Sequence, residues 1–361
     1  MGDGSKHDVV LRAEEARDLC RRILEAAGTG QADAETVSQC LLKADLRGVD
    51  THGLSRLPGY LARISRGLLD PAAEMILDPV TPVAARLDAA NGFGFVAASR
   101  AMDAALERAA AFGIGVVGVS NSTHFGMAAS YLLQAIERGF AALVFTNASP
   151  ALPPWGGRSE LFGTSPLGAA FPGDPPFVLD MAPTIVARGK IRRAAQRGAP
   201  IPEGWALDKD GRPTTDASAA MDGVLLPIGG PKGAGLSMMM DLFGGLFTGA
   251  NFAGTVGNQY KDFDRPQGVG HLVLALKPDL FQPMDEIKTR MAHLAATVKE
   301  SPRAAGVDDI LLPGEPEARI EARRLREGIP YHAQDLAAVV NIARRSNIPL
   351  PAALQHVGHT T

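Results

Sequence analysis

Residues 84–147, AARLDAANGFGFVAASRAMDAALERAAAFGIGVVGVSNSTHFGMAASYLLQAIERGFAALVFTN, contain the pattern that decides the fold class. Short apolar runs at 84–90, 113–120 and 140–147 alternate with Ala- and Leu-rich segments at 95–113 and 126–139. Short apolar runs separated by segments with helical spacing are typical of βα units around a largely buried sheet. The stretch therefore predicts strand, helix, strand, helix and strand in succession.

The same mixture continues downstream, and both ends of the chain read as helical. Strands are predicted at 176–182 and 271–278, and helices at 185–198 and 232–249. Helical spacing also covers 13–28, 33–47, 284–300, 320–328 and 333–347. We therefore expect an α/β central domain at 81–279, enclosed by a mainly helical domain built from 1–80 plus 280–361.

Composition limits the possible partners. The chain has 361 residues, of which 46% are hydrophobic and 21% charged, and a formal net charge of −3. This balance gives no reason to expect nucleic acid, and no apolar run reaches the roughly 18 residues of a membrane span. The first residues lack the apolar stretch of a secretory signal, so we expect a cytoplasmic protein. Cys20 and Cys40 are expected to be free thiols.

Two glycine-rich stretches resemble nucleotide-binding motifs without matching them. Residues 92–97, GFGFVA, fit G-x-G-x-x-A, but no acidic residue follows about 20 positions later, so a turn before a helix is expected. Around Lys232 the Walker spacing is absent, because Gly233 follows the lysine. A glycine-flanked lysine at a helix N-terminus is still suited to bind an anion. The same residues also fit a glycine-rich turn whose lysine is simply solvated.

Polar residues at 47–56 and 124 suit the reduction of a keto acid. Such a reaction needs a proton donor, which histidine provides near neutral pH, and a cation for the substrate carboxylate, which arginine provides. His124 follows an apolar strand and His52 lies in a charged loop with Arg47 and Arg56, although either histidine could be a capping residue. Asp180, at the end of another strand, reads equally as a helix cap or a site residue.

Seven motifs, in order, resemble the malate/L-lactate dehydrogenase family of the non-Rossmann type. The resemblance covers about 19–348 and rests on ADLRGVDTHGLSRLPGY, GIGVVGVSNSTHFG, FGTSPLGAAFP, VLDMAPTIVARGKI, PEGWALDKDGRPTTD, LPIGGPKGAGLSMMMDLFGGLFTGA and LLPGEPE. It implies a non-Rossmann NAD(P)-binding domain and a homodimer.

The resemblance also implies roles for individual residues. His52 and His124 are the candidate acid/base histidines, with Asp180 in support, and we favour His52 as the donor because it shares a loop with Arg56. Arg56 would bind the substrate carboxylate, with Arg47 as the weaker alternative and Thr51 and Thr164 nearby. The residues implied for the cofactor are Asp180, Met181, Ala182, Thr184, Lys232, Gly233, Gly314 and Glu315.

The sequence departs from the family pattern at three places. Thr51 replaces a serine, Ser165 replaces an asparagine, and Pro183 and Thr184 stand where Thr-Ser is common. These changes leave open which acid is the substrate, and nothing in the chain decides between NAD and NADP, although Arg158, Arg188 and Lys190 are basic candidates for a 2′-phosphate.

The resulting hypothesis is an oxidoreductase that transfers a hydride between a nicotinamide cofactor and a small 2-oxo or 2-hydroxy acid of the malate, lactate, sulfolactate or ureidoglycolate type, without a metal. Three alternatives stay open: a reductase of a cyclic imino acid, a ligand-binding relative without activity, and a metal-assisted hydrolase that uses His52, His124 and Asp180 as a facial triad.

Overall fold

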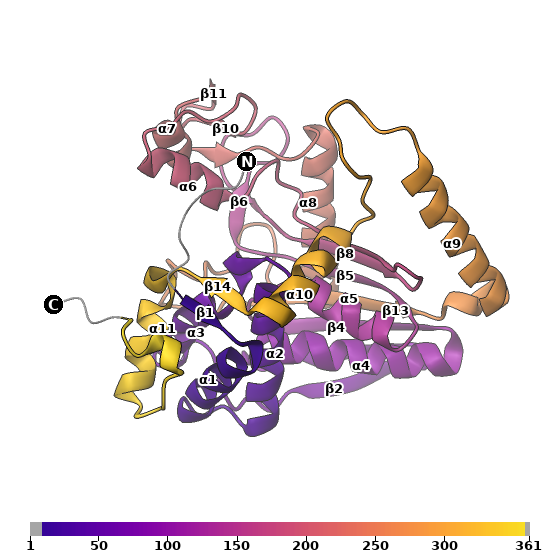
Figure 1. The fold of residues 1–361 in the computed structure, drawn as a ribbon, viewed down its shortest axis with the longest axis horizontal. Helices are drawn as coiled ribbons and strands as arrows, with labels where there is room; N and C mark the ends of the chain where they lie inside the picture. The colour runs from indigo at the N-terminus through magenta and orange to yellow at the C-terminus, as the bar shows by residue number, and fades with distance from the viewer. Residues whose placement is uncertain (1–8, 358–361) are drawn as a thin grey trace.

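A seven-stranded sheet forms the centre of the computed structural model, which describes residues 9–357 (Figure 1). Its strand order is β2-β3-β4-β13-β5-β8-β9. The strands are β2 (Ile76–Thr81), β3 (Ala84–Asp88), β4 (Ile114–Ser122), β13 (Val269–Leu276), β5 (Ala141–Thr146), β8 (Leu167–Phe171) and β9 (Phe177–Met181). The chain is thus a mixed α/β protein, as its alternating pattern predicts.

The predicted succession of strand, helix, strand, helix and strand is present as β3, α4 (Gly94–Phe112), β4, α5 (Ala129–Glu137) and β5, but only one neighbouring pair of strands in this sheet is parallel. β3 and β4 are parallel, joined by α4, whereas every other pair in this sheet is antiparallel. β13 comes from far along the chain and lies between β4 and β5, with Val273 opposite Val117 and Val144. Almost all of β13 is buried, which suits a strand with neighbours on both edges.

Helices cover both faces of the sheet. α4 and α5 pack on the face that carries Val117, Val144 and Val273. α8 (Pro231–Gly244) and the short η3 (Leu246–Thr248) cover the opposite face, where Phe243 meets Phe145. Gly92 lies in the turn before α4, as expected, whereas Gly94 is already the first residue of the helix.

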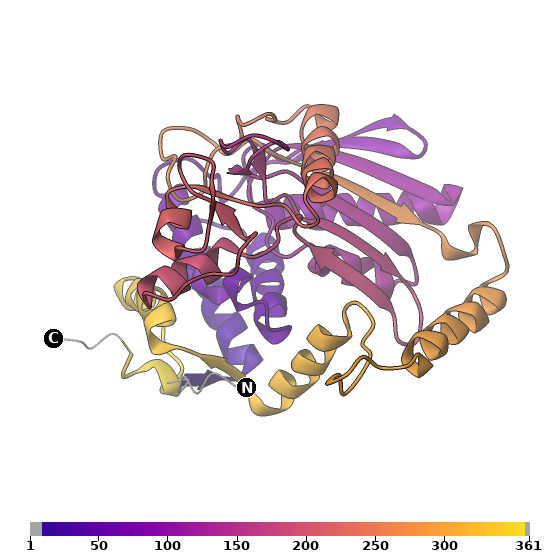
Figure 2. The same ribbon diagram turned by 90° about the horizontal axis from the view of Figure 1, so that it is seen from above.

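The two chain ends meet in a second core. β1 (Val9–Leu11) pairs with β14 (Ile329–Tyr331), and these strands share a core with four helices. The helices are α1 (Ala13–Ala26), α2 (Gln31–Leu46), α3 (Leu57–Ile64) and α11 (Ala333–Arg345). α10 (Glu315–Glu327) contacts α2 and β14, whereas α9 (Met284–Glu300) lies apart at the outer edge in both views (Figures 1 and 2).

A third, smaller core was not expected from the sequence. α6 (Arg188–Gln196) and α7 (Ala217–Met221) pack beside a sheet of β11 (Pro213–Thr214), β10 (Ala206–Leu207) and β12 (Val224–Leu225). β6 (Pro150–Leu152) and β7 (Phe162–Gly163) form a separate hairpin. Strands of two or three residues are too short for period-two alternation to mark them in a sequence.

The structure also bears on the two cysteines and on the hydropathy of the helices. Cys20 and Cys40 are both free thiols. In residues 9–357, no helix has the length and hydropathy that crossing a bilayer requires.

Candidate active site

A buried carboxylate shapes the loop that carries His52 and Arg56. Two short turns, η1 (Asp50–His52) and η2 (Leu54–Arg56), connect α2 to α3. The Asp45 carboxylate accepts hydrogen bonds from the backbone N–H of Leu54 at 2.8 Å and from the Tyr331 hydroxyl at 2.7 Å. A Cβ on Gly53 would lie 1.6 Å from Asp45 Oδ1, so only glycine fits between the carboxylate and the turn.

His124 lies beside His52. It follows β4, and Gly94 at the start of α4 packs so tightly on this segment that a Cβ there would lie 2.1 Å from the Thr123 carbonyl. The two imidazole rings are stacked, with centroids 5.6 Å apart and planes inclined by 23°. The structure therefore brings together the two histidines that the sequence singles out.

The hydrogen bonds of His124 define which of its nitrogens carries the proton. Its Nδ1 lies 3.3 Å from the backbone N–H of Gly126, which can only donate, and 2.8 Å from the Tyr60 hydroxyl. Nδ1 is therefore an acceptor, and the neutral ring carries its hydrogen on Nε2. Burial, together with the neighbouring positive charges, lowers the pKa of His124 well below its usual value.

His52 is also neutral near pH 7. Its Nδ1 lies 3.0 Å from the Thr51 hydroxyl. Burial, and secondly the positive charge of Arg56, lowers the pKa of His52 to about 4. A nearby anion would oppose the Arg56 effect and make protonation of His52 easier.

Arg56 presents a cation next to this histidine pair. Its Nε donates to the Thr51 carbonyl and its NH1 donates to the Tyr260 hydroxyl, while the guanidinium carbon lies 5.2 Å from the centre of the Tyr260 ring. Burial lowers the pKa of Arg56, and the charge of Arg192 adds to this effect. An anion placed here would relieve both penalties, which suits a carboxylate-binding residue.

Arg47, the weaker candidate for the same role, has other partners. It is 4% exposed, and its NH1 lies 2.8 Å from the Glu321 carboxylate while its NH2 donates to the Gly314 carbonyl at 3.2 Å. Arg47 therefore ties α2 to the turn that begins α10.

The segments expected to contact the cofactor form a continuous strip along β9. The backbone N–H of Val178 donates to the Pro313 carbonyl at 3.0 Å, and a Cβ on Gly314 would lie 2.8 Å from the Val178 Cβ. Asp180 and Met181 are in β9, and Ala182 follows it. Glu315 forms an ion pair with Lys299 across the base of α10.

The strip continues beyond Ala182 to the start of α8. Thr184 bridges to Pro227, and the backbone N–H of Ile228 donates to the Pro183 carbonyl at 2.9 Å. Gly229 and Gly230 then adopt positive φ values, and α8 starts with exposed Lys232 and buried Gly233 in its first turn. Lys232 thus lies at a helix N-terminus, as the sequence predicts.

Thr164 lies near this strip, and two of the three basic candidates line a cavity. Thr164 is in the connection between β7 and β8, and β8 begins with Leu167 opposite Met181. Arg158 and Arg188 both line one cavity of about 340 Å³ with Lys209 and Lys261, whereas Lys190 is not in its lining.

Asp180 does not cap the helix that follows it, α6, but contacts the first residue of the earlier helix α5. Its Oδ2 accepts the backbone N–H of Ala129 at 2.8 Å, at the start of α5. Surrounding protein displaces water and raises the pKa of Asp180 to about 6, although part of the side chain is solvent-accessible. In residues 9–357 no three His, Cys, Asp or Glu side chains are grouped closely enough to bind a metal ion, so the facial triad does not form.

Three residues of this site were not singled out in the sequence. Tyr60 contacts His124 through its hydroxyl, Tyr260 contacts Arg56, and the side-chain oxygen of Gln267 accepts the His124 backbone N–H at 3.3 Å. Tyr60 lies four residues after Arg56, on the same helical face, which is a signal that spacing could have provided. Tyr260 and Gln267 are in an irregular segment, where no periodicity identifies them.

Comparisons with known proteins identify the family of the chain. The family model described as malate/L-lactate dehydrogenase matches residues 11–340. The chain is 40% identical over 278 residues to the (2R)-3-sulfolactate dehydrogenase (NADP(+)) of Chromohalobacter salexigens, covering 75% of this chain and 82% of that protein. It is 34% identical over 321 residues to the ureidoglycolate dehydrogenase (NAD(+)) of Escherichia coli, covering 88% and 91%.

A solved structure extends the similarity to the whole fold. The sulfolactate dehydrogenase of Methanocaldococcus jannaschii superposes with a TM-score of 0.89 at 33% identity, over 94% of this chain and 98% of that one. Similarity of this extent in both sequence and structure shows that the chain belongs to the malate/L-lactate dehydrogenase family.

Proposed function

We propose that this protein is an NAD(P)-dependent dehydrogenase that interconverts a small 2-oxo acid and its 2-hydroxy acid. The observation that supports this most strongly is the stacked pair His52–His124 beside the Arg56 guanidinium. A carboxylate on Arg56 would place the neighbouring carbonyl within the reach of an imidazole, which is the geometry that a keto-acid reduction requires.

In this mechanism Arg56 binds the substrate carboxylate and orients the carbonyl. His124 donates a hydrogen bond from Nε2 to the carbonyl oxygen, because its Nδ1 is held as an acceptor by Gly126 and Tyr60. His52 gives the proton to the developing alkoxide, and in the reverse direction takes it from the hydroxyl. The carboxylate on Arg56 prepares His52 by offsetting the positive charge that lowers its pKa.

A bound nicotinamide would supply or accept the hydride, and residues on the strip along β9 are suited to hold it. The start of α8 offers backbone N–H groups, the positive end of a helix dipole and the exposed Lys232 ammonium. Thr184 adds a hydroxyl next to this turn, and Asp180, Met181 and Ala182 lead to it from β9. Gly233, Gly314 and Glu315 complete the proposed cofactor-contact set, for either NAD or NADP, and Thr164 stays assigned to the substrate.

The larger organisation is part of the same proposal. We assign the helical layer from both chain ends and the α/β part to two domains, with a homodimer as the functional unit in the cytoplasm. Exposed apolar side chains at helical spacing on α8 and η3 support a dimer contact there: Met238, Leu242, Phe243, Leu246 and Phe247. A small acid and a nicotinamide are the partners, and neither nucleic acid nor a membrane is invoked.

A spectrophotometric screen tests this function. NADH and NADPH oxidation at 340 nm would be followed with the 2-oxo partners of malate, lactate, sulfolactate and ureidoglycolate, and with piperideine-carboxylate. We expect turnover of at least one 2-oxo acid. Turnover of the cyclic imine alone would favour the imino-acid alternative, and NADH binding without any turnover would favour a catalytically inactive relative.

A further inference from the structure

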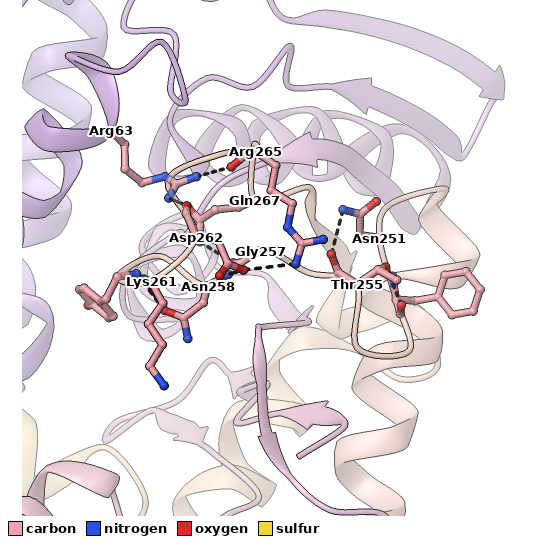
Figure 3. Close-up of polar contacts among 11 residues, drawn as sticks. Arg63, Asn251, Thr255, Gly257, Asn258, Lys261, Asp262, Arg265 and Gln267 are labelled. Carbon is pink, nitrogen blue, oxygen red and sulfur yellow. Dashed lines mark hydrogen bonds and ion pairs between the residues drawn. The ribbon is translucent and has the colours of Figure 1, made fainter. Parts of the chain in front are cut away.

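Three side chains, two from α3 and one from the residue before it, point toward a single loop. Arg56, Tyr60 and Arg63 are spaced by four and three residues, so they lie on the same side of the helix. Opposite Arg63 runs the irregular segment 251–267, where Figure 3 shows Asn258, Asp262 and Gln267. The same segment carries Tyr260. Arg56 contacts Tyr260, and Gln267 contacts the backbone of His124.

Arg63 fixes the backbone of this loop. Its side chain is fully buried, and it donates from NH1 to the Asp262 carbonyl at 2.8 Å and from NH2 to the Arg265 carbonyl at 3.0 Å (Figure 3). A buried guanidinium is costly unless its donors are used, and here its two terminal nitrogens bind main-chain oxygens, while the buried Nε has no hydrogen-bond partner. Arg63 therefore fixes the backbone conformation of the loop at Asp262 and Arg265.

Hydrogen bonds within the loop also hold the backbone around Tyr260. Asn258 Oδ1 accepts the backbone N–H groups of Tyr260 at 2.9 Å and Lys261 at 3.1 Å. Asp262 in turn accepts the Asn258 backbone N–H at 2.8 Å and a bond from Arg265 at 3.2 Å. These contacts fix the position of the Tyr260 backbone, while the side chain itself remains 53% exposed.

We propose that Tyr260 is a substrate-binding residue and that Arg63 and Asn258 are positioning residues that hold it beside Arg56. The phenol oxygen accepts a bond from Arg56, which leaves the phenol hydrogen free to donate. A carboxylate bound to the remaining guanidinium donors would accept that hydrogen as well. This inference rests on the proposed function and adds a second carboxylate contact to it.

The direct test is Tyr260→Phe, which removes only the hydroxyl. We expect KM for the 2-oxo acid to rise about ten- to a hundred-fold, as for a lost hydrogen bond to a charged group, with kcat changed less than threefold. The dissociation constant for NADH, measured by fluorescence titration, should stay unchanged. Asp264→Ala is the matched control, because Asp264 is an exposed residue of the same loop.

The positioning role has its own test, because Arg63→Met could fail to fold. Asn258→Ala should raise KM like Tyr260→Phe, and Asn258→Asp, which keeps the accepting oxygen, should restore it. In the Tyr260→Phe background, Asn258→Ala should add less than twofold, since both changes act on one contact.

Two results are distinguishable. If wild type reduces a 2-oxo acid and Tyr260→Phe keeps KM within twofold, Tyr260 does not bind the substrate and the proposed function stands. If wild type turns over no acid, the proposed function fails and the inference with it.

Discussion

At the scale of single residues, both histidines are neutral in the free protein, chiefly because the surrounding protein lowers the pKa of each. The Nδ1 of His124 is held as an acceptor, and His52 lies partly buried next to the Arg56 cation. We expect His52→Ala and His124→Ala each to lower kcat by roughly 10²–10⁴, the usual loss for a positioned acid or base. Steady-state rates and NADH titrations of the purified variants check this, and near-normal kcat in both would contradict the mechanism.

A third histidine provides a prediction about stability. His271 is fully buried between the Thr146 hydroxyl at 2.7 Å and the Ser122 hydroxyl at 2.8 Å, and burial lowers its pKa to about 3. Below about pH 6.5 the unfolded chain therefore binds a proton at His271, whereas the folded protein does not. The neutral His271 contributes its full stabilisation above that pH, and this stabilisation is lost as the pH falls.

His271→Asn should consequently be most destabilising at pH 7. By pH 5 its cost should shrink by up to about 2 kcal/mol, because the wild type has by then lost the advantage of a neutral imidazole. Urea unfolding at both pH values measures this, with His293→Asn, at an exposed position, as the control. A cost that does not change with pH would show that His271 titrates normally.

At the scale of elements, the loop between α2 and α3 depends on Asp45 and Gly53. A methyl group at Gly53 would overlap the Asp45 carboxylate, so Gly53→Ala should displace the loop that carries His52 and Arg56. We expect a loss of about 1–3 kcal/mol in unfolding free energy and a rise in KM for the acid. Gly30→Ala, where a Cβ meets nothing within 4 Å, is the control, and equal behaviour of the two variants would disprove the steric argument.

Elements with long periodic patterns were predictable from the sequence. The helices α1, α2, α4, α9 and α11 lie close to their expected ranges because their apolar spacing repeats over several turns. The position of β13 between β4 and β5 was not predictable, because strand order depends on long-range pairing. The site divides in the same way: the motifs point to His52, His124 and Arg56, whereas Tyr260 and Gln267 are brought in by an aperiodic loop.

At the scale of the whole molecule, the apolar side of α8 and η3 predicts an assembly of two chains. Sedimentation should give twice the 37.8 kDa chain mass, and Phe247→Asp should shift the population toward the monomer. Phe247 is 67% exposed, and Phe281, 92% exposed near α9, provides Phe281→Asp as the control. A wild-type mass of one chain would exclude the homodimer.

Both chain ends and the central sheet support the proposed reaction site: the ends contact the loop with His52 and Arg56, and β4 of the sheet leads to His124. The most direct measurement of the central claim is the fate of deuterium from NADH or NADPH labelled at the transferable C4 position. With the 2-oxo acid that the screen identifies, we predict one deuterium at C2 of the hydroxy acid by mass spectrometry, and a loss of this product in Arg56→Met. Product without the label, or labelled product at an undiminished rate in Arg56→Met, would contradict it.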